Sequence, residues 1–182
     1  MNSKKYRITF FVSVSVIGLM FIFYFCSLQN TLKQNENNAA IINSAGRQRM
    51  FSQKITQQSL RLFFDAPGKD NASLQDQLNQ TISHFNNAHY FLAPYTDIDS
   101  ISNPLNDSLT MAIYNSIEDA RKRLISNAYS MGFEGEKERS RLSMLFEDQH
   151  IFLEGMDQIV NRYEYNSNKQ NVRLIFLNRT LL

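Results

Sequence analysis

Cysteine is almost absent from this chain, and the single one, Cys26, lies within an apolar segment. An internal disulfide is therefore excluded, and the cysteine content says nothing about the redox compartment. An excess of charge of one sign is missing too, because the formal net charge is only +2 at pH 7. Nucleic-acid binding by charge alone is not indicated, and we expect no nucleic-acid partner.

Catalytic signatures are also missing. No nucleophile motif, phosphate-binding glycine loop or paired-carboxylate arrangement stands out, so we expect no enzyme, no catalytic residue and no cofactor. The 182 residues, 43% of them apolar and 20% charged, suit one membrane anchor and one globular domain of ordinary size.

An uncharged apolar run of 21 residues, Ile8 to Leu28, stands near the N-terminus. At about 1.5 Å per residue, such a helix spans about 31 Å, which matches a hydrocarbon core of roughly 30 Å. Three basic residues precede the run: Lys4, Lys5 and Arg7. The positive-inside rule then places residues 1–7 in the cytoplasm, residues 8–28 in the bilayer and the bulk of the chain in the periplasm. We expect a bacterial inner-membrane protein, single-pass as far as this sequence extends.

A cleaved signal peptide shares the basic start and the apolar run. Its apolar region would be shorter, however, and a small-x-small cleavage site would follow it. The segment from Tyr24 to Leu28 offers no such site, and the small residues expected before a lipidated cysteine do not precede Cys26. A retained anchor is therefore the favoured interpretation.

Beyond the anchor, apolar residues recur at spacings of three and four, the period of an α-helix, and the strict alternation of strands is scarce. The first helix is expected to continue from the membrane span to about Asp65, where Pro67 and Gly68 stop it. A second helix is expected from about Asn71 to the residue before Pro94.

Residues 94–104 are expected to connect to a third helix, from Leu105 to Ala128, with Gly132 and Gly135 bracketing the next turn. The last helix carries a heptad-like stripe formed by Leu142, Leu145, Gln149, Phe152, Met156, Ile159 and Tyr163. The predicted fold class is all-α: the membrane helix continues into an antiparallel, up-down-up-down four-helix bundle over residues 32–182.

The end of the chain leaves two interpretations open. Residues 172–182 are apolar but short, and Arg173 and Arg179 interrupt them. Either the sequence stops at the entrance of a second membrane span, or it is a one-span protein.

The most informative segment lies on the first helix. At about 100° per residue, Arg47, Lys54 and Arg61 form one stripe that looks like a solvated basic face. Arg49 falls on another stripe, with Ile42, Ala45, Gly46, Gln53, Thr56 and Leu60, while the opposite side carries Phe51, Ile55 and Leu62 as core residues. This helix is therefore expected to have two buried faces, one toward its own bundle and one toward something else.

Periodicity alone favours a solvated Arg49, because an arginine on a helix usually reaches water. A seam with alanine and glycine, however, lets a second helix approach closely, where an unpaired arginine is costly. Two copies of Arg49 facing each other at about 6 Å would repel by roughly 3 kcal/mol at an effective dielectric constant of about 20. A small planar oxyanion between them would convert this repulsion into two charge-assisted contacts.

The same segment resembles a known family. Its residues Ile42, Asn43, Ala45, Gly46, Arg49, Met50 and Ser52 match a hallmark segment on the first helix after the first membrane span. That segment is typical of the extracytoplasmic domain shared by type IV pilus methyl-accepting chemotaxis transducers and nitrate/nitrite sensor kinases. The last helix, from Leu145 to Val160, also resembles the end of this domain.

The resemblance implies a sensor domain of a transmembrane signalling receptor, with the motif arginine binding an anion at a dimer axis and backbone near the motif glycine assisting. Carried onto this chain, it implicates Arg49 first and Gly46 second, and Asn43 and Gln53 complete the predicted ligand site. The expected partners are a small anion such as nitrate or nitrite, a second copy of the chain, and the bilayer around Ile8–Leu28. An output domain, such as a histidine kinase, a chemotaxis signalling region or a cyclic-dinucleotide enzyme, is absent from this sequence.

Two other interpretations compete with the sensor. The same seam could bind another protein without any small ligand, as a membrane-anchored interaction module. A metal-dependent oxidase is suggested by Glu147 and His150, but di-iron bundles need a second Glu-x-x-His element, and this sequence has none, so no metal site is expected. We interpret His84 and His89 as ordinary boundary residues, and Arg121, Lys122 and Arg123 as a solvated surface.

Overall fold

A computed structural model describes residues 3–64, 69–92, 103–134 and 138–180 of the chain. Four α-helices account for most of them: α1 (Ser3–Phe64), α2 (Lys69–Leu92), α3 (Ser108–Tyr129) and α4 (Arg139–Thr180). A π-helical turn, η1 (Ser130–Glu134), follows α3 directly. The described residues contain no strand, so the all-α prediction is confirmed.

The helix ends lie close to the predicted ones. Helix α1 runs without interruption from the anchor to Phe64, and α2 stops at Leu92, before Pro94. Helix α3 begins at Ser108, later than predicted, because Asp107 caps it by accepting a hydrogen bond from the Thr110 amide. Most of the predicted connection 94–104 lies outside the described residues, as does Gly135.

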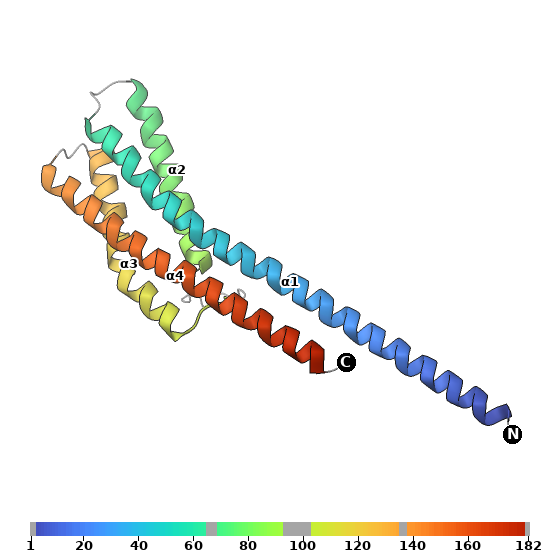
Figure 1. Ribbon diagram of the computed structural model, residues 1–182. Coiled ribbons are helices and arrows are strands. Elements are labelled where there is room, and N and C mark those ends of the chain that lie inside the picture. Colours follow the sequence, from blue (N-terminus) through green and yellow to red (C-terminus); the bar gives the residue numbers. More distant parts are fainter. Residues whose placement is uncertain (1–2, 65–68, 93–102, 135–137, 181–182) are drawn as a thin grey trace. The chain divides into compact units, whose positions relative to one another are not determined.

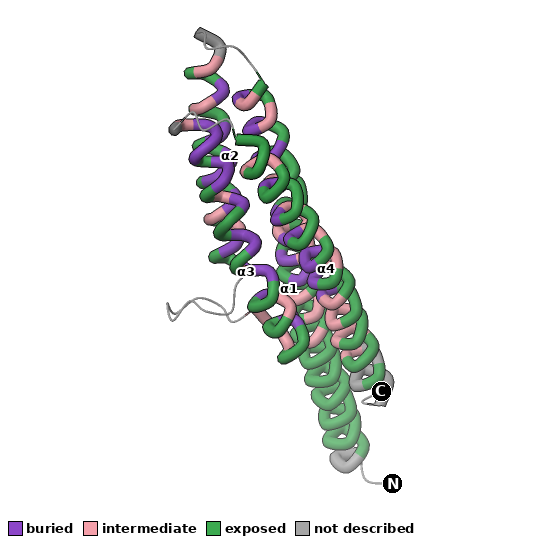
Figure 2. Tube along the Cα trace, turned by 90° about the vertical axis from the view of Figure 1, so that its left-hand side faces the viewer, coloured by how far each residue is buried: buried purple, intermediate pink, exposed green. Residues whose placement is uncertain are grey.

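The chain divides into two units: residues 38–166 form one, and residues 1–37 with 167–182 form the other. In the 38–166 unit, Figure 1 draws successive helices alternating in direction. Its core combines apolar side chains from all four helices, and the buried positions gather on the facing sides of the helices in Figure 2. The predicted stripe of α4 contributes to this core, since five of its members are fully buried: Leu145, Phe152, Met156, Ile159 and Tyr163.

Glycine sets the separation of α3 and α4 at one point. A Cβ atom added to Gly155 of α4 would overlap the Cγ2 atom of Ile117 on α3. At Gly132, in η1, a Cβ would lie 2.7 Å from a methyl group of Leu78 on α2. Both glycines therefore permit close packing that a larger residue would disturb.

A polar cluster fastens α4 to the start of α3. Arg162 Nη2 lies 2.6 Å from Asp107 Oδ2, and Asn166 donates to the same oxygen at 3.1 Å. The hydroxyl group of Tyr163 donates to Asn106 Oδ1 at 2.8 Å and lies 3.3 Å from the hydroxyl oxygen of Tyr114. Burial raises the pKa of Tyr163 to about 12, so its hydroxyl keeps its proton at neutral pH.

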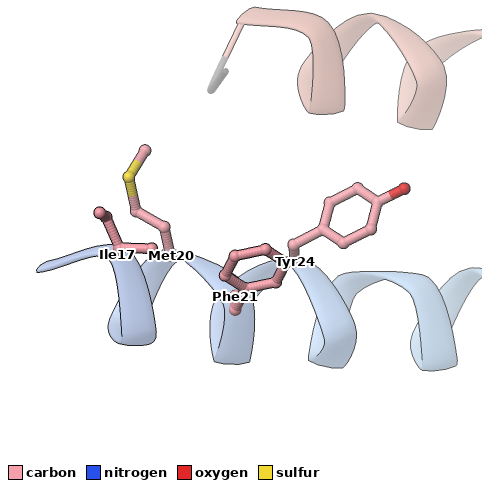
Figure 3. Close-up of a pocket in the computed structure, with 4 residues that line it drawn as sticks. All are labelled: Ile17, Met20, Phe21 and Tyr24. Carbon is pink, nitrogen blue, oxygen red and sulfur yellow. The ribbon is translucent and has the colours of Figure 1, made fainter. Parts of the chain in front are cut away.

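The other unit contains the apolar run Ile8–Leu28. By length and composition, α1 is the one helix among the described residues that could cross a membrane, and none of its most apolar window is buried. Figure 3 shows Ile17, Met20, Phe21 and Tyr24, which line a shallow apolar pocket on this helix. These side chains meet no core of their own chain, which is the pattern expected for a segment solvated by lipid.

Further along the same unit, Gln34 of α1 donates a hydrogen bond to Gln170 of α4, with 2.9 Å between Nε2 and Oε1. The two helices run antiparallel here (Figure 1), so residues after Gln170 proceed back toward the anchor. This contact fixes the register between the two segments of the unit.

Candidate functional site

The four predicted ligand residues all lie on the outward side of α1. Asn43, Arg49 and Gln53 are exposed, and Gly46 is half-buried. They follow one another at helical spacings of three and four, so they share one surface of the 38–166 unit.

Arg49 forms an ion pair with Asp157 of α4 through its Nε atom. The arginine side chain is 44% exposed and the aspartate 48% exposed, so water reaches both partners. The charge of Arg49 is thus neutralised by a neighbour on its own chain. An arginine paired in this way can remain at the boundary of the bundle without a ligand, at a modest electrostatic gain.

Residues between these positions are buried and form hydrogen bonds inside the bundle. Gln48 is fully buried and donates from Nε2 to the main-chain oxygen of Phe85 on α2, at 2.6 Å. Ser52 is also buried, and its hydroxyl donates to the carbonyl oxygen of Arg49 at 2.8 Å. The motif therefore has an inward half that packs α1 and an outward half that surrounds Arg49.

The predicted second buried face of α1 is wrong in part. Ala45 is completely buried and Thr56 is 3% exposed, and both belong to the interior of this chain's own bundle. Ile42, Gly46 and Leu60 are half-buried, while Gln53 is exposed. The stripe that contains Arg49 marks the edge of the single buried face. The predicted basic face of Arg47, Lys54 and Arg61 is confirmed as exposed.

Gly46 differs from the packed glycines of the bundle. A Cβ atom added there would meet nothing within 4 Å, and its backbone does not require glycine. Packing among the described residues therefore gives no reason for glycine at position 46. A close approach from outside the chain would supply such a reason, because only glycine leaves the helix backbone open to a ligand or a second helix.

A second polar site is buried between α2 and α3, and it contains Arg121, predicted to be solvated, and His89, predicted to be a boundary residue. Arg121 is 6% exposed and not solvated, because it binds Glu118 through two hydrogen bonds and donates to Asn86 Oδ1 at 2.8 Å. His89 is 5% exposed, and its Nε2 lies 3.1 Å from Glu118 Oε2. Burial, with the charge of Arg121, lowers the pKa of His89 to about 4, so the imidazole is neutral at pH 7.

Arg123 and Lys122 behave as predicted for exposed side chains, although Arg123 also joins two helices. Its Nη2 atom lies 2.7 Å from Oδ1 of the buried Asp148 on α4. His84, interpreted from the sequence as a boundary residue, is exposed and stacks on Phe51 of α1 with 5.9 Å between the ring centres.

The residues of the metal hypothesis do not converge. His150 pairs with Glu154 at 3.4 Å, and both side chains are largely exposed. Within the described ranges, no three histidine, cysteine or acidic side chains gather closely enough to hold a metal ion.

Residues 30–130 match the family described as the N-terminal domain of type IV pili methyl-accepting chemotaxis transducers. The match covers more than half of the 182 residues and includes the whole motif around Arg49. No curated protein and no solved structure matches the chain. By this match, the chain belongs to the family of N-terminal domains of type IV pili methyl-accepting chemotaxis transducers.

Proposed function

We propose that this chain is the ligand-sensing domain of a bacterial transmembrane receptor. In this proposal, it binds a small oxyanion, such as nitrate or nitrite, at the interface of two copies. An antiparallel up-down-up-down bundle stands in the periplasm and the N-terminal part of α1 crosses the inner membrane. The basic residues before Ile8 support this orientation through the positive-inside rule.

The observation that carries the proposal is the Arg49–Asp157 pair beside Gly46. It offers a guanidinium that is half exposed, held in place, and already balanced by a carboxylate that a ligand can replace. An exposed ion pair of this kind is worth about 0–1 kcal/mol, so a planar oxyanion with two charge-assisted hydrogen bonds can compete with it. Asp157 thereby neutralises the charge of Arg49 when no ligand is bound, and an incoming anion can displace it.

The exchange would couple ligand binding to the contact between α1 and α4. When an anion takes Arg49, Asp157 loses its partner and the two negative charges repel each other. The direct tie between the motif helix and α4 is then weakened, and α4 continues beyond the bundle as far as Thr180. Binding that differs between two arrangements of helices is the requirement for a sensor.

A second copy of the chain would complete the site. In the absence of ligand, each Arg49 is neutralised by Asp157, so two copies can approach without the full repulsion of two bare guanidinium groups. The open space at Gly46 admits the partner's helix or the anion itself. Asn43 and Gln53, both exposed on the same surface, supply further hydrogen-bond donors.

Calorimetric titration of the detergent-solubilised full chain with nitrate, and separately with nitrite, tests this proposal. The Arg49→Ala protein is expected to lose the binding heat. The Arg47→Ala protein is expected to keep it, because Arg47 is an exposed arginine on the same helix but on the solvated basic stripe. Equal heats from the wild-type and Arg49→Ala proteins would remove Arg49 from the ligand site.

The second candidate is a membrane-anchored module that binds another protein through the same surface. Met50, 49% exposed in the middle of this surface, favours it, because such an apolar side chain suits a protein partner. Disulfide crosslinking in membranes distinguishes the two functions. The Gln53→Cys variant is compared with a Lys54→Cys control on the basic stripe, both in a Cys26→Ser background. A yield at position 53 that changes with anion supports the sensor, whereas a constant yield supports the interaction module.

A further inference from the structure

A groove on the membrane-proximal unit is lined by Gln34 of α1 and by Gln170, Arg173, Leu174 and Phe176 of α4, with a volume of about 470 Å³. Its lining surface is mostly apolar, and among the described residues that line it only Arg173 is charged. None of these residues belongs to the surface around Arg49.

The depth of the groove follows from the register within this unit. Gln34 lies six residues beyond Leu28, the last residue of the uncharged run, which is about 9 Å along a helix. Gln170 is hydrogen-bonded to Gln34, and α4 returns toward the anchor, so Arg173 lies about 4.5 Å nearer to the bilayer than Gln170. Arg173 is therefore about 4–5 Å outside the hydrocarbon core, within a headgroup layer about 5–7 Å thick.

The chemistry of the lining changes with depth. Gln34 and Gln170 close the outer end by bonding to each other, and Arg173 follows at the level of lipid phosphates. Leu174 and Phe176 come next toward the core, and Phe176 is 65% exposed. Arg173 is exposed too, and none of the described residues that line the groove with it is acidic. An arginine fork above apolar side chains matches a phosphodiester headgroup above its acyl chains.

We propose that this groove binds an anionic phospholipid, with Arg173 contacting the headgroup phosphate and Leu174 and Phe176 contacting the upper acyl chain. The inference rests on the membrane anchoring of α1 but not on a ligand at Arg49, so either can fail alone. An anionic lipid is favoured over a zwitterionic one because the described lining offers the Arg173 guanidinium and no carboxylate that would balance its charge.

The chain contains no tryptophan, so Phe176→Trp places a single fluorescent reporter in the groove. We would reconstitute this full-length variant in bilayers of phosphatidylglycerol and phosphatidylcholine, and brominate the acyl chains of one lipid at a time. At equal mole fractions, brominated phosphatidylglycerol is expected to quench the tryptophan at least twofold more than brominated phosphatidylcholine. Equal quenching by the two lipids would overturn the proposal.

Two variants that each remove one positive charge, made in the Phe176→Trp protein, show which residue causes the preference for phosphatidylglycerol. Arg173→Gln is expected to make the two lipids quench equally. Lys33→Gln, which removes an exposed cation of α1 that does not line the groove, is expected to leave the preference in place. An equal loss in both variants would indicate general attraction to the surface and contradict a site. Millimolar glycerol 3-phosphate is expected to leave the preference unchanged, and its loss would assign the groove to a soluble phosphate.

Discussion

Arg49 on α1 is paired with Asp157 on α4, and both side chains remain close to half exposed. The pair joins α1, the helix that carries the family motif, to α4. Because water reaches both groups, the contact is weak enough to be exchanged. Asp157 is thus the natural competitor of any anion that binds Arg49.

Removing this competitor is expected to strengthen oxyanion binding. Asp157→Asn eliminates the carboxylate charge, and an exposed ion pair worth about 0–1 kcal/mol corresponds to an affinity gain of up to about fivefold. Calorimetric titration of the full chain measures it. Glu154→Gln is the matched control, because Glu154 is an exposed acidic residue of α4 that pairs with His150 and not with Arg49. Weaker binding by Asp157→Asn would show that the carboxylate supports the site.

The two glycines Gly155 and Gly46 are expected to respond oppositely to alanine. Gly155→Ala forces a methyl group against Ile117 and is expected to destabilise the bundle by roughly 1–3 kcal/mol. Gly46→Ala meets open space and is expected to raise helix stability by up to about 1 kcal/mol. Thermal unfolding followed by circular dichroism measures both. A destabilised Gly46→Ala protein would contradict the open environment described for that residue.

The helices could be predicted because their apolar spacing is a local property of the sequence. The stripe from Leu145 to Tyr163 had to face a core, whatever lay opposite. Arg121 and His89 could not be placed in the same way. Their burial depends on Asn86 and Glu118, and the bond between Arg121 and Asn86 joins α3 to α2 across a packing that no local period encodes.

In the candidate site, too, the features that are local in the sequence could be predicted, and the contacts between helices could not. The motif singled out Arg49 and Gly46, and the spacing correctly placed Arg47 on a solvated stripe. Asp157 was not predicted as a partner, because an acidic residue next to the core residue Met156 can face any neighbouring helix. Only the crossing of α1 and α4 brings its carboxylate to the guanidinium.

Asp107 is expected to be the most sensitive cap in the domain. It accepts from the Thr110 amide at 2.8 Å and pairs with Arg162 at 2.6 Å, and although burial raises the pKa of Asp107, these bonds hold it well below its usual range. Asp107→Ala removes the cap and the pair, and is expected to cost roughly 2–3 kcal/mol of unfolding free energy.

Asp107→Asn keeps an oxygen for the Thr110 amide and loses only the charge, so it is expected to cost about 1 kcal/mol or less. Denaturant titration of the two variants separates the cap from the ion pair. Equal losses would mean that the charge of Asp107, and not its capping oxygen, provides the stabilisation.

Buried His89 is expected to make the domain acid-sensitive above the range in which carboxylates titrate. Its pKa is lowered from 6.5 to about 4 by burial and by Arg121, so the folded state holds the imidazole neutral while the unfolded state protonates it at higher pH. The stabilisation is therefore complete above about pH 6.5 and is lost as the pH falls toward 4. A difference of this size corresponds to about 3 kcal/mol.

Unfolding free energies measured between pH 7 and about 5.5 test this expectation in a window above the usual titration of acidic groups. Burial raises the pKa of Glu118, but the hydrogen bond from Arg121 outweighs this effect, and the pKa is lowered from 4.5. Glu118 therefore loses its own contribution to stability only at still lower pH. His89→Gln removes the titrating group and is expected to flatten the profile, while retaining an amide donor toward Glu118. His84→Gln, a change at an exposed histidine of the same helix, is expected to preserve the slope. If both variants kept the slope, the loss of stability would have to come from groups other than the buried imidazole.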